Sequence, residues 1–228
     1  MNELTQLLKN SSLFCDLSPD TIRFRLIPLG TVQEFSKGNY LIMPQERLKN
    51  FGFVISGSIH TIHITIDGEQ RIMDALETGE IYGADLMCTR SRISPYHAIA
   101  AQPSRVLFFP VPVLLEPGHL PESDRQQILM RLLTIIAHEN MRKDYRLAIL
   151  SQKGLRERIM TYLTMQAGKR NTATFTIPFD REELASFLCV NRSALSHELT
   201  LMKQEGIIQC RKSTFTLLHW KDEERQTF

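Results

Sequence analysis

The spacing of hydrophobic residues divides the chain into stretches of different character. Residues 12–30 favour short helices around a Leu-Ser-Pro-Asp turn. From Val32 to about Pro112, short β-branched runs are separated by glycines, which is typical of antiparallel strands. From Glu122 to about Gln152 the hydrophobic residues recur at helical spacing without glycine or proline. We therefore expect an α+β fold in which an antiparallel β-barrel or jelly roll precedes a long helix and a small C-terminal domain.

One strand and its turn stand out within the β-rich stretch. Ile62, Ile64 and Ile66 alternate with His63 and Thr65, as a half-buried strand requires. Asp67-Gly68 follows and the β pattern then resumes, so the sequence predicts a two-residue hairpin turn there. A further short strand is expected between Gly79 and Gly83.

The long helix carries more apolar surface than one barrel face would use. Leu129, Leu132, Leu133 and Ile136 form a broad stripe. One hypothesis is that half of this stripe packs on the barrel and half on a second copy of the helix. The alternative is a helix covered wholly by its own barrel.

The C-terminal stretch predicts two short helices followed by a wing. Asp180 and Glu183 form a capping-box arrangement at the start of a helix expected over 181–188. Asn191 is placed to cap a second helix over 192–205, which Gly206 would end. Two β runs around Arg211-Lys212-Ser213 would make the wing. Another helix is expected from Leu155 to about Gln166, and this order of elements predicts a winged helix-turn-helix.

Polar residues at the start of the second helix are the candidate DNA-binding residues. Arg192 can bond both acceptors of a guanine, and the other side chains have lengths that reach bases or phosphates from the major groove. The alternative is a helical hairpin that packs against protein and keeps a polar outer face for solubility. The candidate DNA contacts are Asn191, Arg192, Ser193, Ser196 and His197.

The C-terminal motif and the glycine turns together resemble one known family. The segment from Phe179 to Ile208 is similar to the DNA-reading signature of the cyclic AMP receptor protein and fumarate–nitrate reduction regulator (Crp/Fnr) family. The resemblance implies a cyclic-nucleotide-binding-like barrel over 1–120, a dimerisation helix over 121–152 and a winged helix-turn-helix over 153–228. It also implies a homodimer on a palindromic DNA operator, with RNA polymerase as a further candidate partner. The turns that agree with the family's barrel are Lys37-Gly38, Ser56-Gly57, Asp67-Gly68, Gly79-Glu80 and Tyr82-Gly83.

Two residues of the recognition helix depart from the family's frequent Arg-Glu-x-x-x-Arg pattern. Arg192 is kept, but Ser193 stands at the glutamate position and His197 at the second arginine. We expect a changed half-site preference and a weaker guanine contact.

The nucleotide-binding positions of the family also differ. The positions that hold ribose and cyclic phosphate in nucleotide-binding members are occupied by Gly83-Ala84 and Ser94-Pro95, without the glutamate or the arginine. A buried phosphate would then lack its bidentate cation, so we expect an unidentified small-molecule effector rather than cyclic AMP. The candidate effector pocket comprises Gly83, Ala84, Asp85, Arg92, Ser94 and Tyr96.

Composition and charge limit the remaining classes. The chain is 43% hydrophobic and 23% charged, as in an average soluble protein, and no run is long enough to span a membrane, so a cytoplasmic location is expected. Residues 153–228 hold 12 Lys and Arg against 9 Asp and Glu, a slight basic tilt that suits a polyanion.

No metal, cofactor or catalytic site is assigned. Cys15 stands apart from the other cysteines, against an iron–sulfur cluster, and His60 and His63 should point to opposite faces of a strand. Two other classes remain as alternatives: a jelly-roll metalloenzyme, and a ligand-sensing module that contacts protein instead of DNA.

Overall fold

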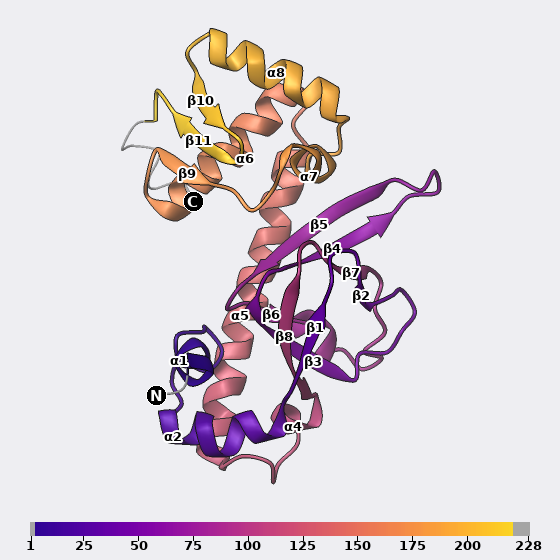
Figure 1. Cartoon of the computed structure of the whole chain (residues 1–228), viewed down its shortest axis with the longest axis vertical. Helices are drawn as coiled ribbons and strands as arrows, with labels where there is room; N and C mark the ends of the chain where they lie inside the picture. Colours follow the sequence, from indigo (N-terminus) through magenta and orange to yellow (C-terminus); the bar gives the residue numbers. More distant parts are fainter. Residues whose placement is uncertain (1–2, 221–228) are drawn as a thin grey trace. The chain divides into compact units, whose positions relative to one another are not determined.

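The computed structural model describes residues 3–220, which form two compact units (Figure 1). The first unit contains the residues up to His63 together with Met73–Met141. The second contains Ile64–Ile72 and the residues from Arg142 onward.

Two antiparallel four-stranded sheets build the β-rich part of the chain, and this confirms the predicted jelly roll. One sheet has the order β1-β8-β3-β6 and the other has the order β2-β7-β4-β5. The first sheet contains β1 (Thr31–Phe35), β8 (Ser104–Pro110), β3 (Asn50–Ser56) and β6 (Ile81–Tyr82). The second contains β2 (Tyr40–Ile42), β7 (His97–Ala100), β4 (Ser58–Ile64) and β5 (Gln70–Glu77).

Aromatic side chains join the sheet β1-β8-β3-β6 to the N-terminal segment. Phe14, Phe51, Phe53 and Phe109 are all fully buried, and the ring of Phe109 lies 5.4 Å from that of Phe51 and 5.9 Å from that of Phe14, measured between centroids. Such aromatic pairs add to the stability that area burial alone provides. The helical elements of this unit are α1 (Glu3–Lys9), α2 (Pro19–Thr21), the π-helical turn η1 (Ile22–Leu26), the 3₁₀ turn η2 (Ile27–Leu29), α3 (Ala84–Met87) and α4 (Pro112–Leu115).

The β4–β5 hairpin differs from its prediction. The amide of Gly68 donates to the carbonyl of Thr65, and the amide of Thr65 donates to the carbonyl of Glu69. Gly68 has a φ of 80°, whereas Asp67 is not in the left-handed region. The turn is therefore a three-residue loop that ends in a left-handed glycine, and the predicted two-residue hairpin turn is wrong. Because β4 ends at Ile64, Ile66 lies in the loop and is fully exposed instead of buried.

The predicted long helix is α5 (Glu122–Leu150). Ile128 and Leu132 are buried on one side of it. Met130 and Leu133 are 66% and 61% exposed, so the first unit does not cover the whole apolar surface of this helix. None of the helices in residues 3–220 combines the length and the apolar character needed to cross a membrane.

The second unit has the predicted order of short helices and strands. The start and end signals read from the sequence are confirmed: Asp180 and Glu183 form a complete capping box, Asn191 caps α8, and Gly206 has a φ of 71° just beyond it. Helix α6 is one turn longer than predicted, and the two following helices are each one residue shorter. The elements are α6 (Leu155–Arg170), β9 (Thr174–Thr176), α7 (Arg181–Phe187), α8 (Arg192–Gln204), β10 (Ile208–Arg211) and β11 (Thr214–Leu217), with the sheet order β10-β11-β9.

A buried arginine and a serine hold the segment Ile64–Ile72 within the second unit. The Ser186 hydroxyl donates to the Gln70 carbonyl at 2.7 Å and accepts from the Ile72 amide at 3.0 Å. The guanidinium of Arg146 donates to the carbonyls of Ile72 and Phe187 and lies 4.5 Å from the centre of the Phe187 ring. These bonds satisfy polar groups that burial would otherwise leave unpaired.

Candidate nucleic-acid interface

Helix α8 is anchored by one apolar side. Leu195, Leu199 and Met202 are at most 3% exposed, and Ala185 of α7 is 2% exposed where the two helices pack. Arg192, Ser196 and His197 are all exposed. The helix therefore presents a polar edge outward while its aliphatic side is fixed to the unit, which is the arrangement that a recognition helix requires.

The turn before α8 is stabilised by two of the predicted contact residues. The Asn191 side-chain oxygen accepts from the Ala194 amide at 2.8 Å and from the Ser193 hydroxyl at 2.9 Å. Asn191 and Ser193 thus serve the cap of the helix, although both remain exposed. Arg192 has the long side chain at this end of α8, and within residues 3–220 neither cap bond involves it.

Helical periodicity separates the exposed residues of α8 into an outer face and a flank. At 100° per residue, Ser193, His197 and Thr200 lie opposite the buried side. Arg192 and Lys203 lie on one flank, together with Ser196. The sequence reasoning missed Thr200 and Lys203, although their spacing of eight and eleven residues from Arg192 could have identified them.

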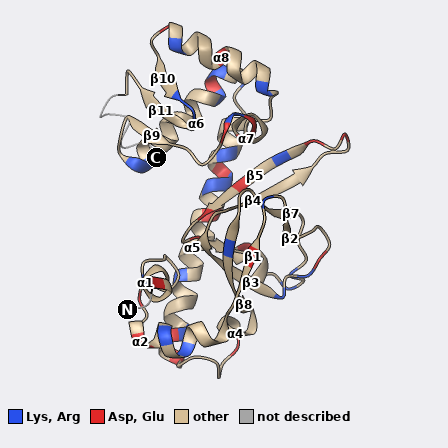
Figure 2. Ribbon diagram, in the orientation of Figure 1, with Lys and Arg blue, Asp and Glu red and all other residues tan. Residues whose placement is uncertain are grey.

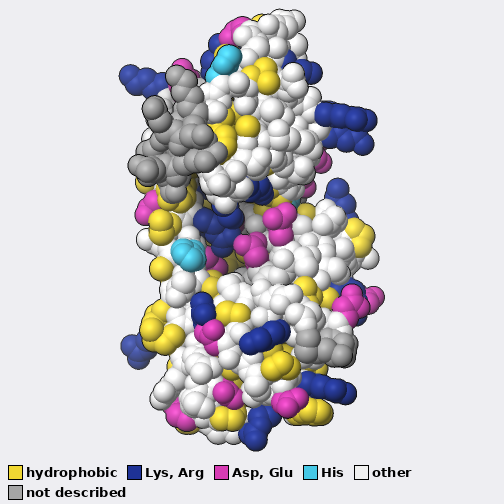
Figure 3. Space-filling view, turned by 90° about the vertical axis from the view of Figure 1, so that its left-hand side faces the viewer, with side chains coloured by type: hydrophobic (Ala, Val, Ile, Leu, Met, Phe, Trp, Pro, Cys, Tyr) yellow, Lys and Arg dark blue, Asp and Glu magenta, His cyan; other side chains and the backbone are white. Residues whose placement is uncertain are grey.

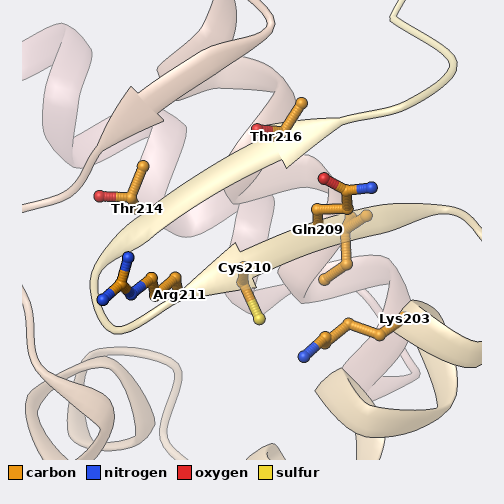
Figure 4. Close-up of a pocket in the computed structure, with 7 residues that line it drawn as sticks. Lys203, Gln209, Cys210, Arg211, Thr214 and Thr216 are labelled. Atoms are coloured by element: carbon orange, nitrogen blue, oxygen red, sulfur yellow. The ribbon is translucent and has the colours of Figure 1, made fainter.

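The wing adds further polar and basic groups next to α8. Lys203 lies with strands β10 and β11 around a hollow of about 520 Å³ (Figure 4). Lys and Arg occur at both ends of α8 and on β10 (Figure 2). Basic groups of this kind suit the phosphate backbone, which supplies most of the sequence-independent affinity for DNA. The side chains that line the hollow include Lys203, Gln209, Arg211, Thr214 and Thr216.

One arginine of α6 clamps the recognition helix from behind. The Nε of Arg156 donates to Glu198 at 2.6 Å, and its two terminal nitrogens donate to both carboxylate oxygens of Glu205 at 2.6 and 2.9 Å. The Arg156 bonds hold the pKa of Glu205 below its ordinary value. Because Glu198 lies inside α8 and Glu205 at its C-terminal cap, Arg156 fixes the helix at two points.

These features define a winged helix-turn-helix of the DNA-binding class. Helix α8 has 13 residues and is about 20 Å long, a size that the major groove of B-form DNA admits. Its exposed end carries a guanidinium, a hydroxyl and an imidazole, which can bond base edges and phosphates.

The residues of the predicted effector pocket lie in the first unit, and only some of them meet. The Tyr96 hydroxyl donates to the Asp85 carboxylate at 2.9 Å, and the Ser94 hydroxyl donates to the Tyr96 carbonyl at 2.7 Å. Burial and the nearby Asp85 charge raise the pKa of Tyr96, so its hydroxyl stays protonated. Arg92 is half-buried and does not join this group, and Gly83 packs over the Leu48 side chain.

At the positions that hold ribose and cyclic phosphate in the family's nucleotide-binding members, these side chains offer neither a carboxylate nor a guanidinium. Ala84 and Ser94 are both fully buried. Ala84 offers no carboxylate for ribose, and the Ser94 hydroxyl is already engaged with the backbone of its own loop. Among residues 3–220, no three His, Cys, Asp or Glu side chains gather as a metal site, and His60 is buried while His63 is exposed.

Comparisons with known proteins agree with this architecture. Residues 32–116 match the cyclic nucleotide-binding domain family, and residues 157–222 match the Crp-like helix-turn-helix domain family. The chain is 27% identical to electron transport regulator A of Shewanella oneidensis over 77% of this chain and 70% of that protein. It is 25% identical to the transcriptional activator protein FnrA of Stutzerimonas stutzeri over 80% of this chain and 74% of that protein.

Solved structures share the fold. FixK2 from Bradyrhizobium japonicum superposes with a TM-score of 0.68 at 17% identity, covering 86% of this chain and 95% of that one. The cyclic di-GMP-responsive regulator CLP of Xanthomonas campestris superposes with a TM-score of 0.69 at 15% identity, covering 89% and 100%. The chain belongs to the Crp/Fnr family of transcription regulators.

Proposed function

We propose that this regulator binds a palindromic DNA operator as a homodimer and changes its DNA affinity in response to a small-molecule effector. The observation that carries the proposal is the orientation of α8: its aliphatic side is buried, and the edge with Arg192, Ser196 and His197 is exposed. In this account the protein acts on transcription in the cytoplasm and catalyses no reaction. RNA polymerase is the further partner that an activator would contact.

An exposed apolar stripe on α5 supports the homodimer. Met130, Leu133 and Met141 are 66%, 61% and 47% exposed, and Ala137 lies between them at the same helical spacing. A helix that repeats apolar residues every three or four positions on an exposed face is suited to pack against a second helix. Two copies related by a two-fold axis would read two half-sites about 34 Å apart, which explains the expected palindrome.

The wing and α8 divide the work of binding. Arg192 would bond the O6 and N7 atoms of a guanine, and Ser196 and His197 would contact bases or phosphates nearby. Asn191 and Ser193 would hold the start of the helix in place and reach the backbone. Lys203 and Arg211 would lie against phosphates and provide affinity without sequence preference.

The effector of this proposal is not a cyclic nucleotide held by the usual side chains. Ala84 and Ser94 support this, since neither can replace the missing carboxylate or guanidinium.

Selection of operators from random duplex DNA tests the proposal. The dimer should enrich one palindromic consensus, and its affinity for that consensus should exceed its affinity for unrelated DNA about 10³-fold or more at physiological salt. A protein that binds every duplex with equal affinity would support the module that contacts protein and would end the operator account.

A further inference from the structure

The first unit contains a cavity that the predicted effector residues do not line. Its volume is about 500 Å³, within the range of small-molecule sites. It lies between β1 and β2 and reaches β3, β6 and β8. Gly83, Ala84, Asp85, Arg92, Ser94 and Tyr96 are absent from its walls.

The floor of the cavity is apolar and aromatic. The side chains of Ile42, Leu48, Tyr82 and Phe108 are all buried. The rings of Phe35 and Tyr82 both pack edge-on against Phe108, with centroids 6.0 and 6.3 Å away. A flat aromatic group would find aromatic faces and edges here and would bury its apolar surface.

A single polar atom belongs to this apolar floor. The hydroxyl of Tyr82 is buried, and within residues 3–220 it has no hydrogen-bond partner. Buried hydroxyls are normally paired, so this one is a donor that a group bound in the cavity could accept from. Burial and the charges of Asp85 and Glu46 raise the pKa of Tyr82, which keeps the hydroxyl protonated as a donor.

Two cations stand at the rim. Arg47 and Lys49 are exposed and line the cavity, and no ion pair engages either of them in the described part of the chain. Glu46 also lines the rim, but its carboxylate accepts from the Met43 amide at 2.8 Å. Among the residues that line the cavity, two cations therefore outnumber one carboxylate, and the rim favours an anion.

We propose that this cavity binds a planar aromatic anion, whose ring lies on the floor and whose anionic group faces Tyr82, Arg47 and Lys49. This inference rests on the proposed function for its role, because the ligand would be the effector of the regulator. Backbone hydrogen bonds connect the wall of the cavity to the loop after α3. The Leu48 amide donates to the Arg92 carbonyl at 2.8 Å and the Ser94 amide donates to the Glu46 carbonyl at 2.9 Å, so a ligand that moves the rim also moves that loop.

The probe for the test is 2-naphthoate, with neutral 2-naphthalenemethanol as its matched partner, and binding is measured by titration calorimetry on the full-length protein. The protein should bind naphthoate and should bind the alcohol about 10-fold more weakly, because the alcohol lacks the charge. Tyr82→Phe, which removes only the hydroxyl, should weaken naphthoate about 10-fold. The double variant Arg47→Gln/Lys49→Gln should weaken naphthoate and leave the alcohol unchanged, whereas Arg25→Gln, at an exposed arginine outside the cavity, should change neither.

Three results would overturn the site: no naphthoate binding, equal binding of naphthoate and the alcohol, or unchanged naphthoate binding by both cavity variants. Thermal unfolding of each variant shows whether it is folded, and Tyr82→Phe keeps the shape of the ring in any case. Operator binding without ligand is measured in parallel. A protein that binds its operator but not naphthoate overturns the cavity alone, and one that binds naphthoate but no operator overturns the proposed function alone.

Discussion

Arg192 is the first residue of α8 and the long side chain at that end of the helix which the cap leaves unengaged. We expect Arg192→Ala to lose about 1–3 kcal/mol of operator binding and to relax the preference at one base pair of each half-site, because a bidentate guanine contact disappears. Lys169→Ala is the matched control: it also removes an exposed cation of the second unit, but it lies at the end of α6. Equilibrium binding to the selected operator and to its single-base variants measures both effects, and equal losses for the two variants would remove Arg192 from the base contacts.

His197 lies on the outer face of α8, one turn after Ser193. An imidazole is shorter than a guanidinium and cannot make the same fork of two bonds to guanine. We therefore expect His197→Arg to enrich guanine at an inner position of the half-site. Selection from random DNA with both proteins checks this, and an identical consensus would contradict it.

The local signals in the sequence were sufficient where neighbouring residues decide the structure. Asp180, Glu183 and Gly206 act within a few residues of themselves, so their roles as caps could be predicted. The length of the turn at Asp67-Gly68 could not be assigned from these two residues alone, because the same pair suits two- and three-residue turns. The bond from the Thr65 amide to the Glu69 carbonyl decides between them.

At the scale of elements, the position of α8 depends on an ion-pair clamp. Arg156→Gln should lower the stability of the second unit, because the partly buried Glu198 carboxylate loses its charged partner. The double variant Glu198→Gln/Glu205→Gln should show a similar loss, whereas Lys153→Gln, which lies before α6, should show almost none. Thermal unfolding at pH 7 makes the comparison, and an unchanged midpoint for Arg156→Gln would show that the clamp is dispensable.

The same clamp gives a pH dependence with a definite sign. The pKa of Glu205 is lowered from 4.5 in the folded chain by its bonds to Arg156. A lowered pKa means that the clamp contributes fully above about pH 4.5 and is lost as the pH falls through the depressed value. On acidification from pH 5 to pH 3, the parent should therefore lose more stability than Arg156→Gln does, and parallel curves would contradict this.

A site that is assembled from strands distant in the sequence was harder to predict. The cavity in the first unit brings together residues of β1, β2, β3, β6 and β8, and no spacing along the chain marks Tyr82 and Phe108 as neighbours. Thr200 and Lys203, in contrast, follow Arg192 on one helix, so their spacing could have identified them although they were not predicted.

At the scale of the whole molecule, the exposed stripe of α5 predicts the oligomeric state. On the face drawn in Figure 3, hydrophobic side chains reach the surface in groups among charged ones. Leu133→Lys should convert the dimer to monomers and weaken operator binding at least about 10-fold, because each half-site would be bound separately. His138→Lys places the same side chain at an exposed position beside the stripe and should leave the dimer intact. Sedimentation equilibrium distinguishes the two, and a dimeric Leu133→Lys protein would place the interface elsewhere.

The most direct test of the account replaces one atom of the DNA. The selected operator is prepared with 7-deazaguanine at the guanine assigned to Arg192, which removes the N7 acceptor and leaves the base pair intact. We predict that this change weakens binding by the parent about 10-fold and weakens binding by Arg192→Ala no further. A similar loss for both proteins, or no loss for either, would show that Arg192 does not read this base.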